Sequence, residues 1–117
     1  MGYMRHHAII VSSFSDEAIK TAHQVATGIF PFVSELIPHV MNGGYTFLVP
    51  PDNSKEGWEE SELGDKRRKE FIEYLNNQRF DDWSTLLSWA EVMYGDEEGE
   101  AAIICHDYDR EPANAED

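Results

Sequence analysis

The sequence predicts an α+β domain in which an antiparallel-rich sheet carries two helices on one face, as in a ferredoxin-like sandwich. Short runs of β-branched and aromatic residues are bounded by glycine, proline and asparagine, which is the pattern of strands and tight turns. Two longer segments place apolar residues three and four positions apart, as amphipathic helices do. The resulting order is β-α-β-β-α-β-β, a ferredoxin-like core with one appended C-terminal strand.

The first two elements are a buried strand and an amphipathic helix. Residues 7–14 are rich in isoleucine and valine and predict the strand. Ser15 suits the N-cap of a helix over residues 16–29, because Asp16 and Glu17 then lie in the first turn, where carboxylates interact favourably with the helix dipole. The apolar stripe of this helix is Ile19, Ala22, Ala26, Ile29 and Phe30.

A hairpin follows the helix. We predict its first strand over residues 33–41, at an edge of the sheet, because Pro38 has no N–H to donate to a neighbouring strand. Residues 42–44, Asn-Gly-Gly, supply the positive-φ positions of a turn. Residues 45–49 form the second strand of the hairpin.

The next segment is polar and then helical. Residues 52–64 predict a loop long enough to take part in binding, and Asp65 is the expected N-cap of a helix over residues 66–77. The basic run at 66–69 would lie in the first turn of that helix, the unfavourable end for cations. We therefore expect nearby acids to neutralise these cations. The alternative is that the cations form a small basic site for a phosphate. The compensating acids are Glu59, Glu60 and Glu62.

Two strands complete the predicted sheet, over residues 86–94 and 101–106. We expect a single α+β domain over residues 1–109 and a flexible acidic tail over residues 110–117.

The charge of the chain is strongly negative and unevenly distributed. The 117 residues include 23 acids and 9 lysines or arginines, for a formal charge of −14. Residues 91–117 hold ten of the acids and one arginine, and residues 52–64 hold five acids and one lysine. Such a field repels nucleic-acid phosphates and anionic lipids, so direct binding to either is disfavoured. It favours encounter with a basic protein surface.

Few residues have a context that supports catalysis. The single Cys105 excludes an intramolecular disulfide, and no apolar run approaches the roughly 20 residues of a membrane span, so we expect a soluble cytoplasmic protein. We predict no catalytic residue, metal or cofactor. The alternative is a small metal- or ligand-binding enzyme that uses His39, His106 and Asp107, if the last strand brings them to one end of the sheet.

The predicted partner-binding site consists of carboxylates with an embedded aromatic anchor, a combination that suits a basic protein surface. Its members are Glu56, Trp58, Glu59, Glu60, Glu62, Asp96, Glu97, Glu98 and Glu100. Trp83 and Trp89 also lie beside acids, and a place in the core is the alternative for Trp89.

In size, charge and lack of catalytic motifs, the chain resembles the small acidic accessory proteins of bacteriophages, of the anti-restriction and anti-CRISPR type. The resemblance rests on the charge pattern of residues 52–64 and 91–117. It implies an inhibitor that mimics nucleic acid and blocks a basic nucleic-acid-handling or defence complex in the host cytoplasm. A homodimeric assembly protein that pairs through an exposed edge strand is a further alternative.

Overall fold

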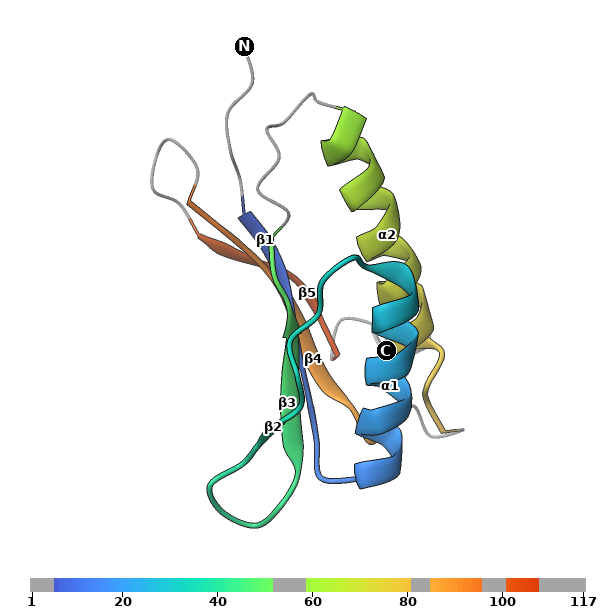
Figure 1. The fold of residues 1–117 in the computed structure, drawn as a ribbon, viewed down its shortest axis with the longest axis vertical. Coiled ribbons are helices and arrows are strands. Elements are labelled where there is room, and N and C mark those ends of the chain that lie inside the picture. The colour runs from blue at the N-terminus through green and yellow to red at the C-terminus, as the bar shows by residue number, and fades with distance from the viewer. Residues whose placement is uncertain (1–5, 52–58, 81–84, 96–100, 108–117) are drawn as a thin grey trace, which may run out of the picture.

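The computed structural model describes residues 6–51, 59–80, 85–95 and 101–107, with the backbone alone at residues 60 and 61. These residues form an α+β fold with a five-stranded antiparallel sheet in the order β2-β3-β1-β4-β5. Both helices lie on the same face of the sheet (Figure 1). The predicted α+β class is therefore confirmed, and the arrangement is compatible with a ferredoxin-like sandwich. The elements are β1 (His6–Ser13), α1 (Asp16–Ile29), β2 (Ile37–Pro38), β3 (Tyr45–Val49), α2 (Glu59–Asn76), β4 (Ser88–Tyr94) and β5 (Ala102–His106).

Strand β1 lies in the middle of the sheet, and its alternating side chains define the two faces. Ile9 pairs with Val49 on β3, and Val11 pairs with Phe47. These positions point toward the helices and are fully or almost fully buried. Ile10, between them, points to the other face and is 41% exposed. The period-two pattern of β1 thus separates the core from an open side of the sheet.

The core lies between the sheet and the helices. Phe71 on α2 is fully buried, and its ring meets those of Phe30 and Phe47 at centroid distances of 5.7 and 6.3 Å. Burial of these aromatic rings contributes much of the apolar area that stabilises a domain of this size. The buried members of the core are Ile9, Val11, Ile19, Ala22, Ala26, Phe30, Phe47, Val49, Phe71, Leu75, Leu87 and Trp89.

Helix α1 has the predicted bounds and the predicted cap. The hydroxyl of Ser15 accepts a hydrogen bond from the backbone N–H of Ala18 at 3.2 Å. Asp16 and Glu17 occupy the first turn. The predicted inward residues Ile19, Ala22 and Ala26 are the fully buried ones.

Helix α2 begins at Glu59, so the prediction of a loop over residues 52–64 and of an N-cap at Asp65 is wrong for residues 59–65. Glutamate is a good helix former, and carboxylates stabilise the first turn of a helix. The basic run at 66–69 consequently lies inside the helix and not in its first turn. Gly64 is buried within the helix.

The predicted strand over residues 33–41 is much shorter in the structure. Strand β2 comprises Ile37–Pro38 alone, at the edge of the sheet as Pro38 predicted. Before it, the chain bonds to β3 irregularly: the Ser34 N–H donates to the Leu48 carbonyl, and the Ser34 hydroxyl accepts from the Leu48 N–H, both at 2.9 Å. A side chain thus replaces a backbone partner, which ends the regular ladder.

The remaining boundaries differ by one or two residues. Strand β1 ends at Ser13 and leaves Phe14 outside, and β4 begins at Ser88 and not at residue 86. The turn at 42–44 has positive φ at Asn42, Gly43 and Gly44, as predicted.

Candidate functional site

Two of the predicted partner-binding carboxylates are described with their side chains. Glu59 and Glu62 lie in the first turns of α2, and both are exposed. For Glu60 the structure describes the backbone, within the same helix. The other predicted members lie outside the described residues, as does Trp83; they are Glu56, Trp58, Asp96, Glu97, Glu98 and Glu100.

The described elements that flank both acidic segments meet at one end of the molecule. Strands β3 and β4 run antiparallel to β1, so Val49 and Tyr94 end beside the start of β1. Ala102 begins β5 at the same level, because it pairs with Met93. Helix α2 also begins at this end, which is uppermost in Figure 1 and is called the upper end below. Residues 52–58 and 96–100 therefore both connect elements at the upper end.

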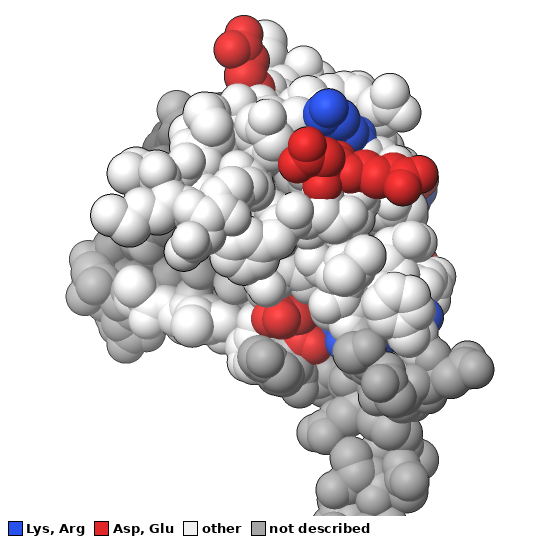
Figure 2. All heavy atoms as spheres, turned by 90° about the horizontal axis from the view of Figure 1, so that it is seen from below, with Lys and Arg blue, Asp and Glu red and all other residues white. Residues whose placement is uncertain are grey.

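The described surface at the opposite, lower end carries exposed apolar side chains beside a few charged ones. Figure 2, which views this end directly, shows a mostly uncharged surface with a few acidic and basic side chains. Several large apolar side chains are exposed in the connections found here. They are Phe14 (73%), Val40 (97%), Met41 (74%), Phe80 (57%) and Leu86 (54%).

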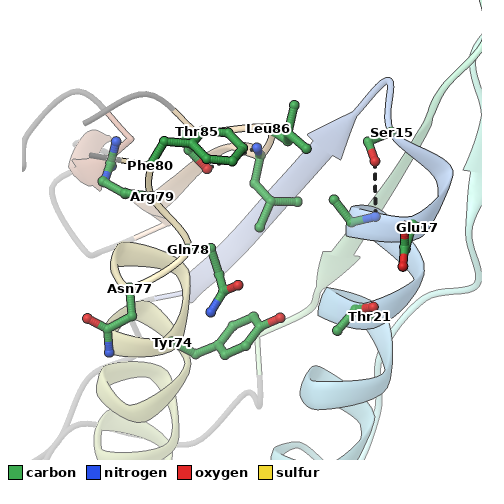
Figure 3. A pocket seen from close by; sticks show the side chains of 12 residues that line it. Ser15, Glu17, Thr21, Tyr74, Asn77, Gln78, Arg79, Phe80, Thr85 and Leu86 are labelled. Atoms are coloured by element: carbon green, nitrogen blue, oxygen red, sulfur yellow. Dashed lines mark hydrogen bonds between the residues drawn. The ribbon is translucent and has the colours of Figure 1, made fainter. Parts of the chain in front are cut away.

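A pocket of about 330 Å³ opens at the lower end between the start of α1 and the end of α2. Tyr74 on α2 extends across it toward Thr21 on α1, and the Gln78 amide also points inward (Figure 3). Burial raises the pKa of the Tyr74 phenol above its usual value of 10.0. The lining mixes hydroxyls and amides with Phe80 and Leu86, which suits binding of a small molecule that has polar and apolar parts.

A buried ionic cluster lies under α2 at the helix-facing side of the sheet, and sequence reasoning missed it. The Glu91 carboxylate on β4 is 3.2 Å from Nδ1 of His7 and 3.5 Å from Nε of Arg68. Arg68 also pairs with Asp65 one turn earlier on α2. Cys105 Sγ is 3.6 Å from the second Glu91 oxygen. The cationic partner and the polar contacts offset the desolvation of Glu91, which is 8% exposed.

This cluster shows other partners than expected for one member of the basic run, Arg68. Arg68 is balanced by Asp65 and Glu91 in the structure, where Glu59, Glu60 and Glu62 were expected. One signal in the sequence could have revealed it. Trp89 and Glu91 share a parity on β4, so a strand that buries the tryptophan also buries the glutamate and requires a partner for it.

His39 does not meet His106 and Asp107, the other residues of the alternative enzyme site. His39 follows β2 and His106 ends β5, and these strands form the two opposite edges of the sheet. Both ring nitrogens of His39 are used locally, with Nδ1 3.1 Å from the Gly43 carbonyl and Nε2 2.7 Å from the Thr46 hydroxyl. Within residues 6–51, 59–80, 85–95 and 101–107, no group of three or more His, Cys, Asp or Glu side chains is arranged to hold a metal ion.

Trp89 belongs to the core. Its side chain is 4% exposed and packs among the buried residues below the helices, so the core alternative holds for this residue. It is not available as an exposed interface anchor.

Comparison with known proteins finds no matching family model, no matching curated protein and no matching solved structure. None of the helices in the described ranges combines the length and the apolarity needed to cross a bilayer.

Proposed function

We propose that this protein is a non-enzymatic acidic binding protein whose upper end occupies the nucleic-acid groove of a basic partner. The observation that carries the proposal is that the described elements flanking both acidic segments meet at the upper end. Glu59 and Glu62 are exposed at the start of α2, the end of the molecule from which residues 52–58 and 96–100 are also reached. Carboxylates gathered at one end create a directional field, whereas evenly scattered carboxylates would mainly aid solubility.

A field directed toward one end of a molecule orients it as it approaches a cationic surface, and this speeds productive encounter. The partner in this proposal is a nucleic-acid-handling or defence complex, the class of target that the resemblance to small acidic phage proteins implies. The carboxylates take the place of phosphates in its groove.

The test is capture of partner proteins from a cell lysate, followed by elution with duplex DNA. The upper-end variant replaces Glu59, Glu62, Glu97 and Glu98 with glutamine and Asp96 with asparagine. A matched control makes the same kind of change at Asp16, Glu17, Glu35, Glu70 and Glu73, which are exposed acids on other parts of the surface. The two variants have the same net charge.

We expect the wild type and the control to capture nucleic-acid-binding proteins that duplex DNA displaces, and the upper-end variant to lose this capture at least tenfold. Binding by the wild type should weaken as ionic strength rises, because salt screens the opposed charges. The proposal fails if DNA displaces nothing, or if both variants lose capture equally. Equal loss would mean that net charge alone governs the association.

A further inference from the structure

The face of the sheet that the helices leave open carries two apolar rows across neighbouring strands. Ile10 on β1 lies opposite Leu48 on β3 and opposite Ala90 on β4. One row further up, Ala8 lies opposite Val92, and Val92 lies opposite Ile103 on β5. We call these six residues and their neighbours on the same side the open sheet face. Both helices lie on the other side of the sheet (Figure 1).

The open sheet face is also free of formal charge among the described residues. Its polar positions carry hydroxyls or imidazoles, and no Asp, Glu, Lys or Arg from the described part of the strands points to this side. These polar positions are His6, Ser12, Thr46, Ser88, Tyr94 and His106. In a chain with 23 acids, a face composed in this way is unusual. The exposed side chains on it include Ile10 at 41%, Tyr94 at 41% and Ile103 at 63%.

We infer that the open sheet face is the interface of a homodimer, with a second copy of this chain as its occupant. Two copies that each carry a charge of −14 repel one another, so they approach at least cost through a surface without carboxylates. The rows on the face are apolar and occupy β3, β1, β4 and β5, so their centre lies between β1 and β4, the strands that carry two of the six residues each. A two-fold axis near Ile10 would therefore bring the same apolar rows of both copies together in a sheet-on-sheet sandwich.

The dimensions of the face agree with a modest interface. Strands of two to eight residues, at about 3.3 Å per residue and about 4.8 Å spacing, give on the order of 400 Å² per copy in projection. Two copies together reach roughly 900 Å², below the roughly 1,200–2,000 Å² of stable complexes and within the range of weak, transient ones. We therefore expect a dimer that dissociates on dilution. This surface differs from an edge strand, where pairing would use backbone groups of β2 or β5.

The test is sedimentation velocity of the full chain over a wide range of concentration, for the wild type and matched variants. Ile10→Glu places a carboxylate near the proposed axis of each copy. Leu63→Glu is the control, because Leu63 on α2 is 45% exposed and the change is chemically the same. Ile103→Glu, at a more exposed position on β5, serves as a second disruptive variant if Ile10→Glu fails to fold, as judged by circular dichroism.

We expect the wild type and Leu63→Glu to dimerise with similar dissociation constants, and Ile10→Glu and Ile103→Glu to weaken dimerisation at least tenfold. Added salt should strengthen the dimer, because it screens the repulsion between copies. That response is opposite in sign to the one expected for binding of a basic partner, so the two proposals succeed or fail separately. If the wild type stays monomeric, the inference is wrong. This holds even if another segment of the chain or a different protein covers the face. A loss in Leu63→Glu equal to that in Ile10→Glu also overturns it.

Discussion

Arg68 on α2 and Glu91 on β4 form an ion pair that links a helix to the sheet, with 3.5 Å between Nε of the arginine and Oε2 of the glutamate. Each side chain is 11% exposed. Pairs of this kind need not add net stability relative to apolar residues, but removal of one partner leaves the other charge buried and uncompensated. We therefore expect loss of Arg68 to lower the stability of the fold.

Replacement of Arg68 by methionine should lower the free energy of unfolding by about 3 kcal/mol, because Glu91 stays buried without its guanidinium partner. Urea unfolding measures the loss. Arg67→Met is the control, since Arg67 is the same residue type, lies next in sequence on the same helix and lines a pocket with Phe30 and Pro50. A second change, Glu91→Gln in the Arg68→Met background, should restore part of the stability. Equal effects of the two arginine variants would contradict the assigned role of the pair.

Gly44 should not tolerate a side chain. Its φ is +92°, and an added Cβ would lie 2.7 Å from the Ser13 carbonyl oxygen and 2.9 Å from Nδ1 of His39. Gly44→Ala should therefore destabilise the fold by about 1–3 kcal/mol, through backbone strain and steric conflict. Gly28→Ala is the matched control: nothing lies within 4 Å of its added Cβ, and Gly28 is helical. That variant should be neutral or more stable by up to about 1 kcal/mol. Thermal melts of the two variants compare them directly, and similar losses would refute the strain argument.

The Tyr74 phenol should lose its proton at a higher pH in the folded protein than in the unfolded chain. Burial raises its pKa in the folded state above the unfolded value of 10.0. The unfolded chain therefore loses this proton first as pH rises, so Tyr74 makes no pH-dependent contribution at neutral pH and reduces stability above about pH 10. The phenolate absorbance of the wild type minus that of Tyr74→Phe isolates the group. The expected midpoint of this difference lies above 10, and a midpoint at or below 10 would show that the phenol is solvated.

Helix α1 shows what local chemistry can specify. Its N-terminus follows from the Ser15 hydroxyl and the carboxylates after it, and its buried stripe follows from the spacing of Ile19, Ala22 and Ala26. Strand β3 and the positive-φ turn before it are similarly local, because Asn-Gly-Gly favours that backbone wherever it occurs. The start of helix α2 was harder to predict, since residues 52–64 are polar and indicated a loop, whereas the structure is helical from Glu59.

The sequence by itself determined the α+β class, the bounds of α1 and β3, the edge position required by Pro38 and the concentration of acids in two segments. These properties depend on periodicity, capping, turn chemistry and composition, which act over a few residues. Only the tertiary structure decided which distant residues meet. It separated His39 from His106, because β2 and β5 lie at opposite edges. It joined Glu91 to Arg68, and it placed both helices on one face of the sheet, so that the strand residues described on the other face carry no formal charge. Such contacts follow from strand order and register, and these depend on how the whole chain buries its apolar surface.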